Sequence, residues 1–428
     1  MADSGQFNSE LMAFLDASPT PFHAVQSMQQ RLQQAGFVRL DESQPWQLQP
    51  AGRYYTIRNG SSLIAFVRGT AALPEGGLRL IGAHTDSPCL MIKPHADLHA
   101  HGYHQLSVEV YGGALLNPWF DRDLSIAGRI VVSAGDGQLR SRLIDFKRPM
   151  AVIPSLAIHL DREANSDRTI NPQNDIKPIL LQGGDSSLQA IIAEQFMAAG
   201  EQLVDCELSL YDCAGATLSG ADSQFISSAR LDNLLSCFVG LQSLLASDAS
   251  HTAVLVCNDH EEVGSVSAVG ADGPFLQAVL GRICGDQLDS ALATSLLLSC
   301  DNAHALHPNF PAVHDAAHLP QLNGGPVIKT NVKQRYASNA LGAALVKQLA
   351  GRCGVPLQSF VARNDMGCGS TIGPISAAKL GVNTLDIGIP QLAMHSAREL
   401  TGASDPLRLA TLLTAFINSA APLCVIAD

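Results

Sequence analysis

Residues 252–265 read TAVLVCNDHEEVGS, an apolar run followed directly by a cluster of acidic side chains and one histidine. A short run of this composition is typical of a strand that is buried on both faces of a sheet. Two adjacent carboxylates, Glu261 and Glu262, lie where this strand should end. Neighbouring side chains of an extended chain point to opposite faces. We therefore expect alternation to aim the two groups differently around one centre.

The same strand-like texture recurs along the chain. Three further runs have it, namely LRLIGA (78–83), SLLLSC (295–300) and VNTLDIGI (382–389). Between the runs lie segments with apolar residues at helical spacing, namely LDNLLSCFVGLQSLLAS (231–247), SNALGAALVKQLAGRCG (338–354) and DPLRLATLLTAFINSAAPL (405–423). Strands that alternate with helices predict an α/β fold, in which a mostly parallel sheet is sandwiched by helices.

The middle of the chain has a different pattern. Between 93 and 220, short alternating runs such as LSVEVYGGALL and SIAGRIVVSAGDG are separated by glycine-rich turns. This pattern is typical of antiparallel β structure. We therefore expect two domains, an α/β domain formed by 1–92 and 221–428 and a β-rich domain inserted at 93–220.

Composition excludes several classes of function. The 428 residues are 46% hydrophobic and 15% charged, which is typical of a compact globular protein. A formal net charge of -12 without a basic run argues against nucleic acid or an anionic membrane as a partner. The ten cysteines are scattered without a CxxC pair, which favours reduced thiols and argues against a thiolate zinc site. With no apparent secretory signal or membrane span, we expect a cytoplasmic protein.

Histidine and acidic residues follow the predicted strands. His84 and Asp86 come directly after 78–83, and Asp301 comes directly after 295–300. Asp232 opens a predicted helix, and His395 follows the last predicted strand after a short loop. Each position alone has an ordinary structural explanation, such as a helix cap or a surface histidine. Because α/β sheets bind ligands beyond the carboxyl ends of their strands, their joint placement predicts one shared site.

The residue types in this group favour a metal. Imidazoles combined with several carboxylates are ligands for Zn²⁺, Mn²⁺ or Co²⁺, and a pair of ions that share a carboxylate is known from aminopeptidases. Asp86 can accept the second ring N–H of His84 and fix its tautomer. The motifs HExxH, GxSxG and the phosphate loop are absent. We interpret four clustered histidines as surface or interface residues, namely His95, His99, His101 and His104.

Several strings together resemble the aspartyl aminopeptidase family, dinuclear metallo-aminopeptidases that remove N-terminal acidic residues. These are GAHTDSPCLMIKP, YGGALLNPWFDRDL, IPSLAIHLDR, RLDNL, NDHEEVGS, SCDNAHALHPN, NGGPVIKTN and AMHSARE, and the resemblance covers nearly the whole chain. It implies two divalent ions per subunit, most often Zn²⁺ with Mn²⁺ or Co²⁺ as alternatives. The implied metal ligands are His84, Asp232, Glu262, Asp301 and His395. Asp232 would bridge the ions, with His84 and Asp301 on one and Glu262 and His395 on the other.

The resemblance also implies roles beyond the ligands. Glu261 would be the general base that activates the water, and Asp86 the catalytic partner that orients His84. Lys329 and Tyr336 would receive the acidic side chain of the substrate, although a lysine at this position is otherwise an ordinary surface residue. The inserted domain would mediate dimerisation within a tetrahedral dodecamer, and His159 would enter the site of a neighbouring subunit.

Three alternatives remain open from the residues. The first is a metal-free hydrolase that uses two carboxylates, such as a glycosidase. The second is a non-catalytic assembly subunit, which the intact set of candidate ligands disfavours. The third is an aminopeptidase that prefers neutral residues, because net charge alone does not set the specificity of a pocket.

Overall fold

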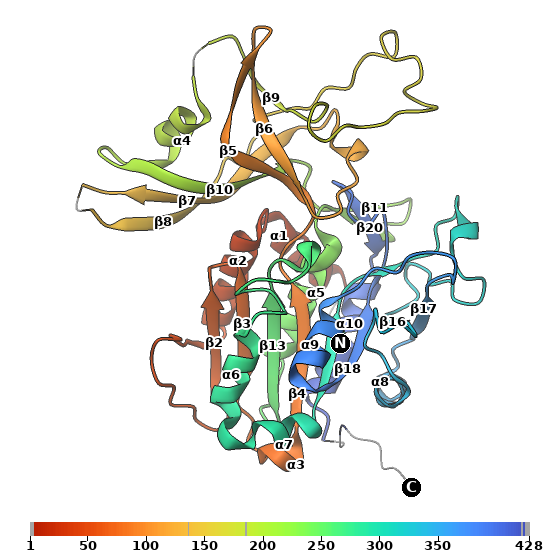
Figure 1. Cartoon of the computed structure of the whole chain (residues 1–428). Helices are drawn as coiled ribbons and strands as arrows, with labels where there is room; N and C mark the ends of the chain where they lie inside the picture. Colours follow the sequence, from red (N-terminus) through yellow and green to blue (C-terminus); the bar gives the residue numbers. More distant parts are fainter. Residues whose placement is uncertain (1–3, 136, 185, 421–422, 424–428) are drawn as a thin grey trace. The chain divides into compact units, whose positions relative to one another are not determined.

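The structure is a computed structural model that describes residues 4–135, 137–184, 186–420 and 423 (Figure 1). The chain forms two compact units. One, here called the α/β unit, comprises Met1–Asp86, Ala216–Met394 and Glu399–Asp428. The other, here called the inserted unit, comprises Ser87–Gly215 and the short segment His395–Arg398. None of the described helices is long and apolar enough to cross a membrane.

The α/β unit is built on a nine-stranded sheet in the order β1-β2-β3-β13-β4-β14-β18-β16-β17. Its four central strands are parallel neighbours, namely β13 (Thr252–Asn258), β4 (Leu78–His84), β14 (Leu296–Cys300) and β18 (Asn383–Gly388). They correspond to the four strand-like runs in the sequence, so the α/β prediction is confirmed. The flanking strands, of which β3 and β16 pair antiparallel with the centre, are β1 (Val38–Arg39), β2 (Arg53–Arg58), β3 (Ser62–Val67), β16 (Val327–Thr330) and β17 (Gln358–Val361).

Helices cover both faces of this sheet. Alternate residues of β13 enter different cores: Leu255 and Cys257 pack with residues of α1, α2, α5 and α10, whereas Val254 and Val256 pack with residues of α6 and α7. Burial on both faces explains why the central strands read as continuous apolar runs. The helices of the unit are α1 (Ser4–Asp16), α2 (Pro21–Gln34), α3 (Leu73–Gly76), α5 (Leu231–Leu245), α6 (Phe275–Cys284), α7 (Leu288–Ala293), α8 (Ala340–Cys353), α9 (Ile372–Leu380) and α10 (Asp405–Ile417).

A smaller five-stranded sheet also belongs to the α/β unit. Its strands, in spatial order, are β11 (Thr217–Ser219), β12 (Phe225–Ser228), β20 (Glu399–Gly402), β19 (Pro390–Leu392) and β15 (Ala303–His304). β15 begins two residues after Asp301 and β19 ends shortly before His395, so this sheet anchors both loops.

The inserted unit has an antiparallel six-stranded sheet and its own apolar core. Its elements are β5 (Cys89–Ala100), β6 (Tyr103–Tyr111), β7 (Leu124–Ser133), β8 (Leu139–Asp145), β9 (Ile179–Gln182), β10 (Gln202–Asp212) and α4 (Leu188–Phe196). The unit begins at Ser87 and ends at Gly215, whereas the sequence analysis expects 93 and 220. The start differs because the apolar residues from Cys89 onward already belong to β5 of the new sheet.

The histidine cluster of the inserted unit is not uniformly exposed. His104 is buried, and its Nε2 lies 2.6 Å from Oδ1 of Asp97. His99 stacks on its ring. The surface interpretation is therefore wrong for His104, because a carboxylate partner on the same hairpin compensates for its burial.

Candidate metal centre

Sheet topology brings the ends of three strands to one edge. His84 is the last residue of β4 and pairs in register with Asn258, the last residue of β13. Asp301 directly follows β14, which is parallel to β4 on its other side. Asp232 is the second residue of α5, which packs on β4. The Nε2 atom of His84 consequently lies 3.5 Å from Oδ1 of Asp232 and 3.9 Å from Oδ1 of Asp301.

The spacing of these donors fits a metal ion. Ligands that share a zinc ion at about 2.0–2.2 Å lie no more than about 4.4 Å from one another. The two distances from Nε2 fall within this limit, and the potential ligand atoms of His84, Asp232 and Asp301 all lie within 4.8 Å of one another. All three residues are buried. The buried carboxylates of Asp232 and Asp301, within 4.8 Å of each other, repel each other unless a cation lies between them.

The electrostatics of His84 also favour a cation here. Burial lowers the pKa of the imidazole, but contacts with the carboxylates of Asp232 and Asp301, and then of Asp86, outweigh it and raise the pKa well above its ordinary value. The surrounding carboxylates thus stabilise a positive charge at the ring. A divalent ion held by Nε2 would supply that charge in place of the proton.

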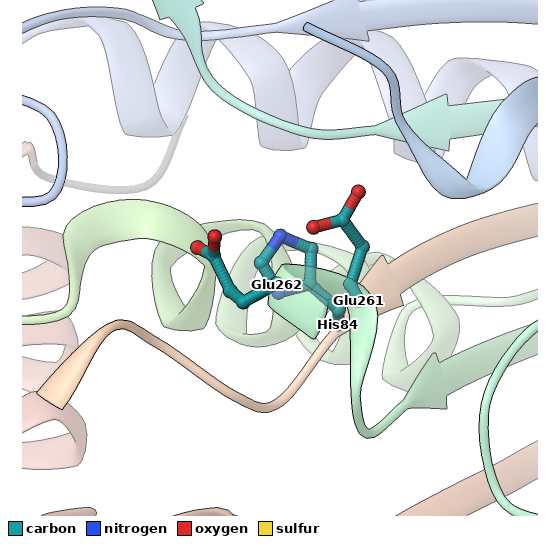
Figure 2. A group of neighbouring side chains, drawn as sticks. All are labelled: His84, Glu261 and Glu262. Carbon is teal, nitrogen blue, oxygen red and sulfur yellow. The ribbon is translucent and has the colours of Figure 1, made fainter. Parts of the chain in front are cut away.

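Glu261 and Glu262 form a second group with His84. Potential ligand atoms of these three residues also lie within 4.8 Å of one another, and Figure 2 shows the two carboxylates on either side of the imidazole. The two glutamates lie in a one-turn 3₁₀ helix, Glu261–Val263. The residue before it, His260, has a left-handed backbone conformation with a φ of 64°. Strand alternation is therefore the wrong explanation for their divergence. It comes from the 3₁₀ geometry, in which each residue turns by about 120°.

Asp86 holds this turn and the histidine together. Its fully buried carboxylate accepts hydrogen bonds from the backbone N–H groups of Glu261 (3.1 Å) and Glu262 (3.0 Å). Asp86 also contacts Nδ1 of His84 with two oxygens. The side-chain Oδ1 lies 3.3 Å from this nitrogen, and the backbone carbonyl oxygen lies 3.1 Å from it. Sequence reasoning predicts only the contact with His84. A proton on Nδ1 directs the lone pair of Nε2 towards the site.

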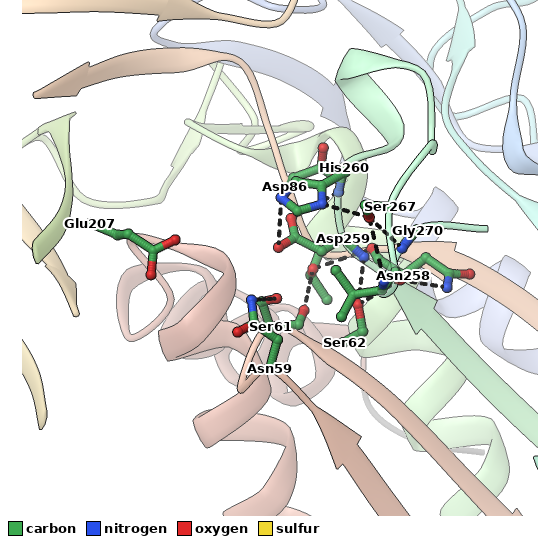
Figure 3. Close-up of polar contacts among 12 residues, drawn as sticks. Asn59, Ser61, Ser62, Asp86, Glu207, Asn258, Asp259, His260, Ser267 and Gly270 are labelled. Atoms are coloured by element: carbon green, nitrogen blue, oxygen red, sulfur yellow. Dashed lines mark hydrogen bonds and ion pairs between the residues drawn. The ribbon is translucent and has the colours of Figure 1, made fainter. Parts of the chain in front are cut away.

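The loop before the 3₁₀ turn is fixed by further polar contacts (Figure 3). The Asp259 N–H donates to Oγ of Ser62 (2.8 Å), and Nδ1 of His260 lies 2.8 Å from Oγ of Ser267. Burial and the nearby Asp86 carboxylate raise the pKa of Asp259 to about 6. Sequence analysis assigns nothing to Asp259 or His260, because their partners Ser62 and Ser267 lie in other segments.

Glu261 has the electrostatic character of a base. Burial raises the pKa of its carboxyl to about 7, against the opposing effect of the His84 imidazole. Three neighbouring carboxylates add to the increase, those of Asp301, Asp86 and Asp232. A group with this pKa can take up and release a proton near neutral pH.

Sequence reasoning also misses Glu399. This carboxylate is buried at the start of β20, and its Oε2 accepts a hydrogen bond from the backbone N–H of Asp232 at 3.0 Å. The only signal in the sequence is its place at the end of the string AMHSARE.

Lys329 is a buried residue rather than a surface lysine. It lies in β16, is 2% exposed, and its Nζ is 3.4 Å from Oδ2 of Asp301. The same ammonium donates to the carbonyl oxygen of Asn302 at 3.1 Å and lies 5.1 Å from the ring centre of Tyr336. Tyr336 is buried too, and burial together with a hydrogen bond to Cys368 raises the pKa of its hydroxyl. Lys329 therefore directly borders the buried donor group.

The remaining two predicted site residues belong to the inserted unit. His395 opens the segment His395–Arg398, and its Nδ1 lies 3.1 Å from the carbonyl oxygen of Gly113. That contact selects the tautomer whose Nε2 carries the lone pair. His159 is exposed in a loop, beside the exposed apolar side chains of Ile158 and Leu160.

Comparison with known proteins assigns the family. Residues 14–417 match the family described as aminopeptidase I zinc metalloprotease (M18). A probable M18 family aminopeptidase 2 from Azotobacter vinelandii is 56% identical over 423 residues, which cover 97% of this chain and 98% of the relative. A protein of the same name from Pseudomonas fluorescens is 54% identical and covers 96% and 98%.

Solved structures give the same answer. A chain of the Ape4 and Nbr1 complex, determined by cryo-EM, has a TM-score of 0.93 and 40% identity, over 97% of this chain and 86% of that one. The mApe1 dodecamer of S. cerevisiae has a TM-score of 0.85 and 30% identity, over 95% of both chains. The family's description implies a divalent metal, which the donor group around His84 fits. This chain belongs to the aminopeptidase I zinc metalloprotease family, M18, and is a metallo-aminopeptidase.

Proposed function

We propose that this aminopeptidase removes the N-terminal residue of peptides, preferentially Asp or Glu, with two divalent cations and with Glu261 as the general base. The observation that supports this most is the pair of donor groups that share His84, a buried set with Asp232 and Asp301 and a second set with the partly buried Glu261 and Glu262. A single ion held by the first set would leave the carboxylate of Glu262 without a role.

We assign the ligands as follows. His84 and Asp301 would hold one ion, Glu262 and His395 the other, and Asp232 would be shared between them. This mixture of imidazole and carboxylate donors suits Zn²⁺, with Mn²⁺ or Co²⁺ as alternatives. The tautomer that Gly113 selects for His395 presents Nε2 as the donor.

The chain's own residues would perform the proton transfers. The two cations, when bound, supply activation of the water and polarisation of the scissile carbonyl. Glu261 would accept the proton of the attacking water and deliver it to the leaving amine. Burial raises the pKa of its carboxyl, which favours uptake of the proton, and Asp86 keeps its backbone in place.

Lys329 and Tyr336 would select acidic side chains. An ammonium group has three protons, and its partners in the described part of the chain include Asp301 and Asn302. A substrate carboxylate would be a further partner, with the Tyr336 hydroxyl as a second donor. Preference for a neutral residue is the alternative, in which Lys329 serves only to compensate Asp301.

Assembly and location complete the proposal. The relation to the mApe1 dodecamer supports a homo-oligomer, and we propose a tetrahedral dodecamer in which the inserted unit mediates dimerisation. His159, exposed on that unit, would enter the site of a neighbouring subunit. The absence of disulfides among the described cysteines is compatible with a cytoplasmic enzyme.

The test compares substrates and metals in one experiment. Metal-stripped protein is refilled with Zn²⁺, Mn²⁺ or Co²⁺, its metal content is measured, and hydrolysis of Asp-, Glu- and Leu-anilides is followed. We expect two ions per subunit and faster cleavage of the acidic substrates. Faster cleavage of the Leu substrate than of both acidic ones would overturn the specificity, and activity that survives complete metal removal would instead support a two-carboxylate hydrolase.

A further inference from the structure

The two aspartates of the proposed metal site are each followed by an asparagine, and these asparagines cross-link the aspartate segments. The side-chain Nδ2 of Asn233 donates to the carbonyl oxygen of Cys300, the residue before Asp301, at 2.7 Å. The side-chain Nδ2 of Asn302 donates to the carbonyl oxygen of Leu231, the residue before Asp232, at 2.9 Å. The pattern is reciprocal, since each segment provides one donor and one acceptor.

The orientation of both amides is determined by their partners. A backbone carbonyl oxygen can only accept, so the nitrogen of each side-chain amide must face it. The second proton of the Asn302 amide is used as well, because Nδ2 also lies 2.5 Å from Oε1 of the buried Gln391. Both asparagines are almost completely buried, at 0% and 3% exposure, so water does not compete for these bonds.

No direct strand pairing joins the two aspartate segments: β12 before Asp232 and β15 after Asp301 belong to the same five-stranded sheet, but β20 and β19 lie between them. Asp301 follows β14, whose neighbours in the sheet are β4 and β18. Asp232 lies at the start of α5, which is not part of any sheet. The two asparagine bonds therefore join the aspartate segments directly. On the other side, Oε2 of Glu399 accepts the backbone N–H of Asp232.

We propose that Asn233 and Asn302 form a reciprocal clamp that sets the separation of Asp232 and Asp301 for metal binding, an inference that rests on the proposed dinuclear site. The clamp holds two mutually repelling carboxylates near His84 before any ion is bound. Both asparagines are positioning residues, since they act through the backbone of the aspartates. Their loss widens the site and lowers the affinity for the ions.

The test uses full-length Asn233→Ala, Asn302→Ala and the double variant. Asn8→Ala is the matched control, because the buried Asn8 also donates its Nδ2 to a distant backbone carbonyl, that of Ala403, at 2.8 Å. Three quantities are measured for each protein: the thermal unfolding of the metal-free form, the affinity for Zn²⁺ in competition with a chelator, and the visible absorption spectrum of the Co²⁺-saturated form.

We expect each clamp variant to bind Zn²⁺ roughly 10- to 100-fold more weakly, as is usual when a group that orients a ligand is removed. The Co²⁺ spectrum should change at saturation, because the coordination geometry changes. The double variant should lose less than the product of the single effects, since both bonds constrain one distance. Asn8→Ala should lower the unfolding temperature of the metal-free form without altering affinity or spectrum.

Two results separate the clamp from the proposed function. Wild-type affinity and an unchanged Co²⁺ spectrum in both single variants would overturn the clamp while leaving the two-ion site intact. Failure of the wild-type protein to bind two ions would instead overturn the proposed function. If an alanine variant does not fold, Asn→Ser at the same position, which fills more of the cavity, is judged by the same affinity and spectrum.

Discussion

The two units place their site residues by different means. In the α/β unit, β4, β13 and β14 are parallel and end at one edge, where His84, Asp301 and the glutamate turn meet. In the inserted unit all strand pairs are antiparallel, and its two candidate histidines lie in loops. Parallel neighbours bring their carboxyl ends together by topology alone. We therefore expect the α/β unit to provide the general base and most of the metal ligands, and the inserted unit to contribute its two histidines.

The largest effect should follow from a change in the α/β unit that leaves the metal in place. Glu261→Gln keeps the size of the side chain but removes the base, so we expect kcat to fall by about 10²- to 10⁴-fold. The metal content, measured by mass spectrometry, should remain that of the wild type. Glu262→Gln is the matched control, because it should lose metal at the second position. A Glu261→Gln enzyme with near-normal kcat would show that the base is elsewhere.

The same comparison explains what can be predicted from sequence. The central strands and the residues at their ends are local signals, because a buried parallel strand is apolar throughout and its polar end marks the edge of the sheet. The 3₁₀ turn of Glu261, the bonds from Asp86 to that turn and the burial of Lys329 depend on contacts between distant segments. No local pattern encodes such contacts. The boundary at Ser87 is missed for a related reason, since β5 is as apolar at its start as β4.

The next effect tests whether the inserted unit acts across subunits. His159→Ala should lower kcat by roughly 10²- to 10³-fold if the imidazole is one of the donors that stabilise the transition state. Because the side chain is exposed, the unfolding temperature should not change. His95→Ala, at another exposed histidine of the same unit, is the control and should keep full activity.

Mixing subunits shows whose site His159 serves. When His159→Ala and Glu261→Gln proteins are dissociated and reassembled together, some sites combine an intact Glu261 with an intact His159 from a neighbour. We expect activity well above that of either variant alone. No recovery in mixed assemblies, shown by mass spectrometry to contain both chains, would place His159 outside the neighbouring site.

A smaller effect should follow from replacing Asp86, which positions the glutamate turn and His84. The Asp86→Asn variant has only one acceptor oxygen, where two backbone N–H groups and His84 contact the carboxylate. We expect the affinity for Zn²⁺ to fall by roughly 10- to 100-fold. Asp405→Asn is a matched control, because the buried Asp405 also accepts two backbone N–H groups, those of Asn323 and Gly325. Equal loss of affinity in both variants would mean that Asp86 contributes only general stability.

The smallest effect concerns specificity, and a ratio is the appropriate measurement. Lys329 lies 3.4 Å from Asp301, so we expect its removal to alter metal binding and the rate with every substrate. The ratio of kcat/KM for Asp- and Leu-anilides cancels that common effect. Lys329→Met should reduce this ratio by at least about tenfold, because a hydrogen bond to a charged group is worth about 1.5–3 kcal/mol. Lys347→Met, at an exposed position of α8, should leave it unchanged. An unchanged ratio in Lys329→Met would show that the lysine only balances the charge of Asp301 and that other residues of the pocket determine the substrate preference.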